Sequence, residues 1–203
     1  VLALQHELAA DGRLLSNFVL MGMGEPLLNY EASVGAVRRL VDPRGPAFTP
    51  RRVTLSTVGV APAIKRLSQE QLGLQLAVSL HAATDDLRDE IVPANRRWPL
   101  AALFSALRTY VDQTRRRVLL EWVLVDGLTD TPAQTEALVE RVADLAAHIN
   151  LIQLNPTPFY SGRPSTPAAL AAFVAQLDRA GVPHTVRQRR GAEIMAGCGQ
   201  LGL

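Results

Sequence analysis

The residues best suited to chemistry lie just after runs of apolar residues, and the first of them is Glu25. It stands in the stretch GMGEP at positions 22–26, where two glycines let the backbone approach a ligand closely. Its carboxylate could accept a hydrogen bond from a ligand amine. The alternative is a glycine-rich turn with a surface glutamate, which is the commoner situation for a bare G-x-G-E-P pattern.

Hydroxyl groups follow the next apolar run. Ser56 and Thr57 precede Gly59, a pattern that can bind an anion or a carboxylate at a helix N-terminus or can simply form an N-cap.

A histidine follows the third apolar run, in Ser79-Leu80-His81. It could be a metal ligand, a general base or a hydrogen-bond donor. The other three histidines, at positions 6, 148 and 184, show no metal-ligand spacing, so we expect no histidine-rich metal site. The acidic and basic residues at 85–90 most simply form a solvated short helix.

Three more residues complete the candidates. Glu121 lies within an apolar run, where a carboxylate needs a partner; it either pairs with an arginine, which we favour, or lines a ligand pocket. Asn155 offers a donor and an acceptor to a ribose or an amino acid group, although a turn residue before proline is commoner. Cys198 is flanked by glycines and follows an arginine cluster, which favours a reactive thiolate, whereas a lone cysteine is usually inert and buried.

These candidates need a scaffold that brings strand ends together, and the sequence pattern predicts one. Apolar runs of strand length alternate with segments of helical period. The expected strands are 18–21, 53–56, 74–80, 118–125, 150–154 and 184–187. Helical stripes run over 100–111, 138–149 and 170–177. Thr131-Pro132 and Thr166-Pro167 are typical helix starts, and Gly181 is a typical helix stop.

The order of elements is a helix, five strand–helix units and a last strand. This order predicts an α/β fold with a parallel sheet, open or curled into a barrel, and we expect one domain over residues 1–203. In either form the site lies in loops after the carboxyl ends of the strands, where the candidates occur. A helix before the first strand is unusual, since such a helix normally follows a strand.

Composition excludes several classes of protein. The 203 residues are 48% apolar and 20% charged with a net charge of +2, the balance of an ordinary globular protein. One cysteine allows neither an internal disulfide nor a cysteine-based metal site within the chain. No apolar run is long enough for a membrane span, and polar residues at 5–7 exclude a signal peptide at the start, so we expect a cytoplasmic protein without a membrane partner. Every basic residue except Lys65 is an arginine, which suits phosphate contacts but also solvated loop ends.

Taken together, five stretches of the sequence resemble one family. They are GMGEPLLNY, RRVTLSTVGVAPAIKRL, LAVSLHA with DxLRDEIVPANRR, INLIQLNPTP and RRGAEIMAGCGQL. In order and wording they resemble the RlmN/Cfr family of radical S-adenosylmethionine RNA methyltransferases, and the GMGEP and CGQL motifs are specific to it. The resemblance covers nearly the whole chain and favours RlmN over Cfr, which acts at a different carbon of the same adenine.

The resemblance implies a partial TIM-like (βα)6 radical-SAM barrel lacking its first strand. It also implies methylation of C2 of an adenine in large-subunit ribosomal RNA and some transfer RNAs, with S-adenosylmethionine and a [4Fe-4S] cluster as cofactors and an external electron donor. Gly24 and Glu25 match the pair that binds the S-adenosylmethionine amino group. The other matching cofactor contacts are Ser56, Ser79, Leu80, His81 and Asn155. Cys198 matches the catalytic cysteine, which is methylated and then carries the methyl group to the base.

The chain also departs from the family pattern. The C-x-x-x-C-x-x-C cluster motif is absent, as are the N-terminal RNA-binding domain, the carboxylate that deprotonates the adduct and the second cysteine. One cysteine cannot hold a four-iron cluster, so we expect an N-terminally truncated member with no catalytic activity by itself. Val58, Gln153 and Gly197 stand where a serine, a proline and an alanine are usual.

Two other functions remain open at this stage. A stand-alone product could keep a binding role for RNA or S-adenosylmethionine, with an RNA affinity that falls steeply with salt. An unrelated barrel enzyme could use His81 with Glu25 as an acid–base pair. We further expect the strand at 18–21 to be an unpaired apolar edge, which favours self-association.

Overall fold

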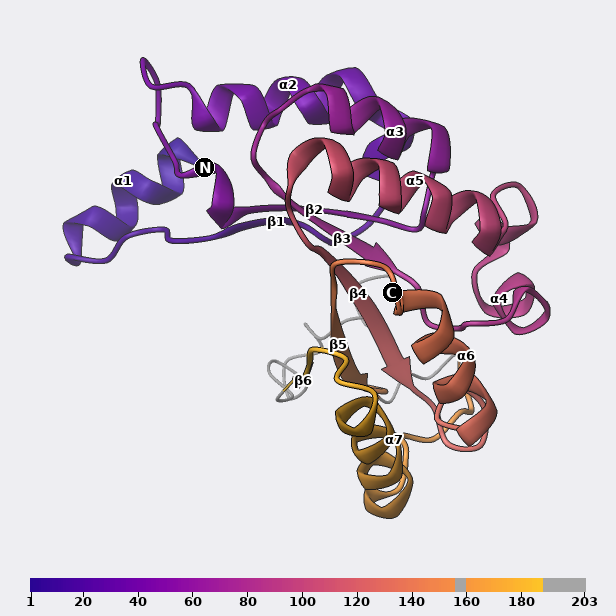
Figure 1. Cartoon of the computed structure of the whole chain (residues 1–203). Helices are drawn as coiled ribbons and strands as arrows, with labels where there is room; N and C mark the ends of the chain where they lie inside the picture. The colour runs from indigo at the N-terminus through magenta and orange to yellow at the C-terminus, as the bar shows by residue number, and fades with distance from the viewer. Residues whose placement is uncertain (156–159, 188–203) are drawn as a thin grey trace.

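The computed structural model describes residues 1–155 and 160–187, and these residues form a six-stranded parallel sheet with helices between the strands (Figure 1). The strands are β1 (Phe18–Leu20), β2 (Val53–Thr57), β3 (Gln75–Ser79), β4 (Val118–Leu124), β5 (Ala147–Gln153) and β6 (His184–Val186). The α-helices are α1 (Leu2–Ala10), α2 (Tyr30–Val41), α3 (Ala61–Gln69), α4 (Asp85–Ile91), α5 (Leu100–Thr114), α6 (Pro132–Val142) and α7 (Pro167–Arg179). Short 3-10 helices are η1 (Pro26–Asn29), η2 (Pro50–Arg52) and η3 (Pro93–Arg96).

The strands are hydrogen-bonded in the order β1-β2-β3-β4-β5-β6, so their order in space is their order in the chain. Crossovers between parallel strands are right-handed, and successive crossovers in one direction place their helices on one face of the sheet. Figure 1 shows helices α2 to α7 along the outer side of the curved sheet in this way. A doubly wound sheet would reverse its strand order once. The fold is therefore the predicted α/β fold of partial TIM-like barrel type.

The central strands are fully buried on the face that packs against the helices, whereas Leu119 and Val123 on the opposite face are half-buried. Leu76, Val78, Leu120 and Trp122 have no exposed surface. They belong to one cluster of buried apolar residues to which every helix from α2 to α7 except α4 contributes. This packing fixes the strands, and hence the positions at which their carboxyl ends open into loops.

Every expected strand is present, but one helical expectation was wrong. The predicted stripe over 138–149 ends at Val142, and Ile149 lies instead in β5, paired in register with Leu120 of β4. Apolar residues at 142, 145 and 149 all face the same core, so their spacing imitated a continued helix. The predicted helix starts are confirmed: Thr131 accepts a hydrogen bond from the amide of Gln134, and Thr166 accepts one from Ala169.

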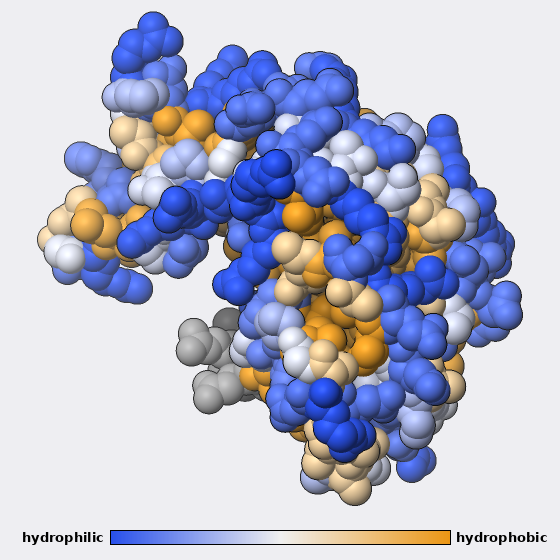
Figure 2. All heavy atoms as spheres, in the orientation of Figure 1, coloured by the Kyte–Doolittle hydropathy of each residue, from blue (hydrophilic) through white to orange (hydrophobic). Residues whose placement is uncertain are grey.

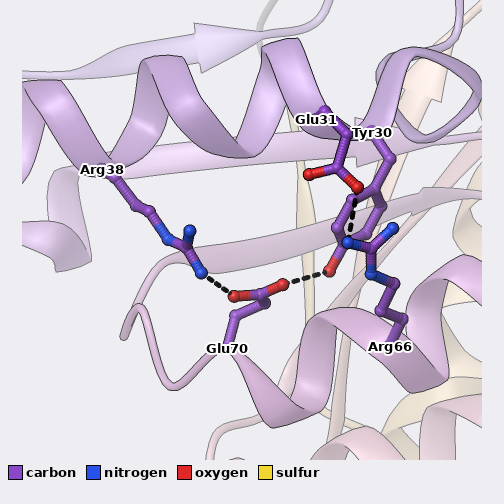
Figure 3. Close-up of polar contacts among 5 residues, drawn as sticks. All are labelled: Tyr30, Glu31, Arg38, Arg66 and Glu70. Atoms are coloured by element: carbon purple, nitrogen blue, oxygen red, sulfur yellow. Dashed lines mark hydrogen bonds and ion pairs between the residues drawn. The ribbon is translucent and has the colours of Figure 1, made fainter.

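Polar contacts join α2 to the end of α3 on the outer layer (Figure 3). The Tyr30 hydroxyl donates to Glu70 Oε1 at 3.0 Å, and Arg38 pairs with the other oxygen of this carboxylate. Arg66 donates to Glu31 at 2.5 Å, and its guanidinium lies 3.9 Å from the centroid of the Tyr30 ring. Burial and the Glu70 carboxylate raise the pKa of the Tyr30 phenol, so the hydroxyl remains a donor.

The N-terminal helix differs from the others because it buries no residue. Leu2 and Leu4 are exposed, and Figure 2 shows apolar surface over this segment, which extends from the rest of the molecule in Figure 1. Within the described ranges, none of the helices has both the length and the apolar character needed to span a bilayer.

Candidate functional site

A cavity of about 950 Å³ opens at the carboxyl ends of β1 to β5. This volume is at the upper end of the range for small-molecule sites, which run from about 300 to 1,000 Å³. Of the predicted cofactor contacts, those that line it are Gly24, Glu25, Ser56, Ser79, His81 and Asn155. The fold thus brings residues that are far apart in the sequence together around one cavity.

Among the predicted cofactor contacts, Leu80 does not line this cavity. The Leu80 side chain has no exposed surface and belongs to the apolar core. Its main chain contacts its neighbours, because its amide donates to Glu121 O and its carbonyl accepts from Arg88. Cys198 lies outside the described residues.

Glu25 organises the loop after β1. Its Oε1 accepts a hydrogen bond from the amide of Leu27 at 2.9 Å and so caps η1, while its Oε2 accepts one from the amide of Val58 at 2.7 Å. The preceding Gly24 has a φ of +86°, which favours glycine. An ionised carboxylate offers about four acceptor positions, so two amides leave room for a donor from a ligand.

His81 lines the cavity and has an unusual backbone conformation. Its φ of +59° turns the chain out of β3, and the amide of Val123 donates to its Nδ1 at 3.2 Å. Burial, with a smaller contribution from the Arg88 cation, lowers the pKa of the imidazole to about 4. The ring is therefore neutral at pH 7 with its proton on Nε2, which favours the hydrogen-bond donor among the three predicted roles.

Thr57 and Ser56 have different tasks at the end of β2. The Thr57 hydroxyl accepts hydrogen bonds from the amides of Gly59 at 3.0 Å and Val60 at 3.4 Å, so it stabilises the turn into α3. Both residues line the cavity, so Thr57 supports the turn and contributes to the cavity wall as well. The sequence pattern thus contains a turn and a site residue side by side.

Glu121 satisfies both predicted alternatives, since it pairs with an arginine and lines the cavity. Its residue is 3% exposed; Oε1 accepts a hydrogen bond from Asn150 Nδ2 at 2.9 Å, and Oε2 lies 3.5 Å from Arg187 Nη1. Burial raises the pKa of the carboxyl, and the contacts with Asn150 and Arg187 oppose this shift without cancelling it.

The burial of Arg88 was not predicted from the sequence. Residues 85–90 were expected to be a solvated helix, and this is wrong for Arg88, which has no exposed surface. Its guanidinium lies against main-chain carbonyls and one asparagine, which satisfy a buried cation in a way that residue type alone does not reveal. A signal was present in the helical spacing, because Arg88 falls three residues before Ile91 on one helix face.

No family model matches the chain. The dual-specificity RNA methyltransferase RlmN 1 of Myxococcus xanthus is 51% identical over 201 residues, which cover 99% of this chain and 56% of that protein. The probable dual-specificity RNA methyltransferase RlmN of Frankia alni is 50% identical, and the match covers 97% of this chain and 48% of that protein. In sequence and fold, this chain belongs to the RlmN family.

Solved structures agree with this membership. A radical SAM methyltransferase from Sphaerobacter thermophilus has a TM-score of 0.94 and 46% identity, over 98% of this chain and 58% of that one. A domain of pyruvate-formate lyase-activating enzyme from Bacteroides vulgatus has a TM-score of 0.67 at 14% identity, which shows the fold alone. The chain spans about half the length of the curated RlmN relatives it matches.

The two cofactors implied by RlmN membership fit this chain differently. The cavity offers carboxylate, hydroxyl, imidazole and amide groups, a donor set that suits the charged amino acid and ribose parts of S-adenosylmethionine. A four-iron cluster needs several thiolates, and the sequence holds one cysteine. Among residues 1–155 and 160–187, no group of three or more His, Cys, Asp or Glu residues could hold a metal ion. The residues of this chain fit the first cofactor and cannot ligate the second.

Proposed function

We propose that residues 1–203 form a single radical-SAM core domain whose cavity binds S-adenosylmethionine. The observation that supports this most is the convergence of six predicted cofactor contacts on one cavity at the strand ends. Ligands of parallel α/β folds bind at this edge of the sheet.

The proposed roles follow from the chemistry of each side chain. Glu25 accepts from the amino group of the ligand, and Gly24 allows the close approach. Ser56, Ser79 and Asn155 offer hydrogen bonds to the carboxylate and the ribose, and His81 donates through Nε2. Leu80 takes part through its backbone, because its side chain is in the core.

For the whole protein we propose methylation of C2 of an adenine in large-subunit ribosomal RNA and in some transfer RNAs. The relatives' names as dual-specificity RNA methyltransferases support this reaction. Cys198 is the proposed carrier of the methyl group, the cytoplasm the proposed location, and an external donor the proposed source of electrons. The cluster ligands are not among these 203 residues, so we propose that the isolated chain binds S-adenosylmethionine without methylating RNA.

A chimeric protein tests the methylation directly. The 203 residues replace the matching segment of the Myxococcus xanthus relative, and C2-methyladenosine is measured by mass spectrometry in cells without their own enzyme. We expect methylation, its loss in Cys198→Ala, and its retention in Glu136→Gln, a change on α6 away from the cavity. A chimera that folds and holds its cluster but leaves every adenine unmethylated contradicts the proposed reaction.

A further inference from the structure

The buried guanidinium of Arg88 ties together the ends of two strands that line the cavity. Its Nη2 donates to Val58 O at 2.7 Å and to Ser79 O at 3.1 Å, and its Nε donates to Leu80 O at 3.0 Å. Strands β2 and β3 end at Thr57 and Ser79, so all three acceptors are main-chain carbonyls at those ends. A single planar side chain thereby fixes the separation of the two strand ends.

On the β2 side, the tie continues to Glu25. The main chain of Val58 makes both contacts: its carbonyl accepts from Arg88 and its amide donates to Glu25 Oε2, at 2.7 Å in each case. A shift of Arg88 therefore moves the residue whose amide holds the Glu25 carboxylate in place.

On the β3 side, the tie continues to His81 and β4. The amides of Leu80 and His81 both donate to Glu121 O, at 3.1 and 3.3 Å, and the amide of Val123 donates to His81 Nδ1. The hydrogen bonds thus run without a break from the loop after β1 to β4, and Arg88 is the side chain that joins the two halves.

The charge of Arg88 is compensated at a distance through Asn95. Arg88 Nη1 donates to Asn95 Oδ1 at 2.8 Å, and Asn95 Nδ2 donates to Asp85 at 2.9 Å and to Asp89 at 2.7 Å. Burial lowers the pKa of the guanidinium to about 10, and the two carboxylates oppose this shift. A buried charge gives little net stability even when its hydrogen bonds are satisfied, because removing it from water is costly. The role of Arg88 therefore lies in the positions of the groups that it binds.

Gly59 lies where the Arg88 guanidinium passes the end of β2. Its φ is +110°, and a Cβ at this position would lie 3.1 Å from Leu103 Cδ1 and 3.5 Å from Arg88 Nη2. The positive φ and the close Leu103 side chain favour glycine here, and the 3.5 Å contact with Arg88 adds no further constraint.

We propose that Arg88 is a positioning residue for the cofactor: it holds the ends of β2 and β3 so that Ser56, Ser79 and His81 face one ligand. Arg88 does not line the cavity and acts only through the main chain. The identity of the ligand rests on the proposed function, whereas the clamping of the strand ends does not depend on it.

The test compares backbone hydrogen exchange in the wild-type chain, Arg88→Lys, Arg88→Met and, as a matched control, Arg108→Met, which removes an exposed arginine paired with Asp144. We expect amides at 58–60 and 80–83 to exchange at least about tenfold faster in Arg88→Met, with β5 amides unchanged. Arg88→Lys keeps the charge but cannot reach both strand ends, so it gives an intermediate increase. Equal acceleration over the whole sheet, or no acceleration in Arg88→Lys, would overturn the proposal.

A second measurement separates this proposal from the proposed function. The affinity of each variant for S-adenosylmethionine is measured by calorimetry, and we expect Arg88→Met to bind at least about tenfold more weakly and Arg108→Met to bind as the wild type. If the wild-type chain does not bind, the proposed ligand is wrong, and the exchange pattern still decides the role of Arg88. If Arg88→Met does not fold, Arg88→Lys with Asn95→Ala decides it: local acceleration supports positioning, and uniform acceleration overturns it.

Discussion

Individual residues of the cavity take their chemistry from backbone groups as much as from one another. The Glu25 carboxylate accepts a hydrogen bond from the amide of Val58, just after β2, and the His81 ring accepts one from the amide of Val123 in β4. These bonds select the orientation of each side chain and, for His81, the tautomer. This arrangement disfavours an acid–base pair of His81 with Glu25, because a ring nitrogen that accepts from an amide cannot also accept a proton from a substrate.

Replacing His81 should change how stability depends on pH. The pKa of His81 is lowered from 6.5 to about 4, so its contribution is fully present above pH 6.5 and is lost as pH falls toward 4. We expect the wild type to lose about 2 kcal/mol more than His81→Asn between pH 7 and 4, since asparagine also tolerates positive φ. Urea denaturation at both pH values measures the difference; equal losses would contradict it.

Glu121 should behave in the opposite way. Burial raises its pKa, so its contribution is fully present below the pKa of the unfolded chain and is lost as pH rises through the folded pKa. Glu121→Gln keeps an acceptor for Asn150, and we expect it to be more stable than the wild type at pH 7, with a higher Tm. The advantage should vanish at acid pH. Thermal denaturation across this range checks the sign, and a less stable variant at pH 7 refutes it.

At the scale of elements, the sequence predicted those strands and helix starts that the spacing of apolar residues and the capping residues determine. Strands β1 to β6 and the starts of α6 and α7 follow from apolar runs and threonine–proline caps. The end of α6 did not follow because it depends on the pairing of β5 with β4, and the burial of Arg88 did not follow because it depends on carbonyls at the strand ends. For the site, the sequence predicted that the candidate residues lie at the ends of strands. It did not predict the main-chain carbonyls that bind Arg88, or that the Leu80 side chain lies in the core.

The edge strand β1 should cause self-association. In the described structure β1 pairs only with β2, and Val19 is 61% exposed on it. Such an edge offers unpaired main-chain groups to a second copy. We expect sedimentation of the wild-type chain to depend on concentration, and Val19→Lys to weaken association by about tenfold. Leu28→Lys, which changes an exposed residue of η1, should not. A wild-type chain that stays monomeric at all concentrations would contradict this expectation.

The contacts between α2 and α3 should contribute unequally to stability. Tyr30 is buried and bonds a carboxylate, so Tyr30→Phe should lower the free energy of unfolding by about 1 kcal/mol. Arg38 is exposed, and Arg38→Ala should change it by less than about 0.5 kcal/mol. Chemical denaturation compares the two variants, and an equal loss of unfolding free energy in both would contradict the expected difference.

At the scale of the whole molecule, the chain combines the proposed cofactor cavity with a single cysteine, too few thiolates for a cluster. Three observations support a binding site in the cavity: the order of the strands, the convergence of six candidate residues and the RlmN membership. A cluster would need three or four thiolates in addition. We therefore expect cofactor binding to be measurable on this chain separately from radical chemistry.

The most direct measurement is a calorimetric titration of S-adenosylmethionine into the 203-residue chain and into Gly24→Val. We predict saturable binding to one site with a micromolar Kd for the wild type. Binding should weaken at least about tenfold in Gly24→Val, because a branched side chain is strained at a φ of +86° and projects at the cavity wall. No saturable binding to the wild type, or equal binding to both chains, would show that this cavity is not the cofactor site.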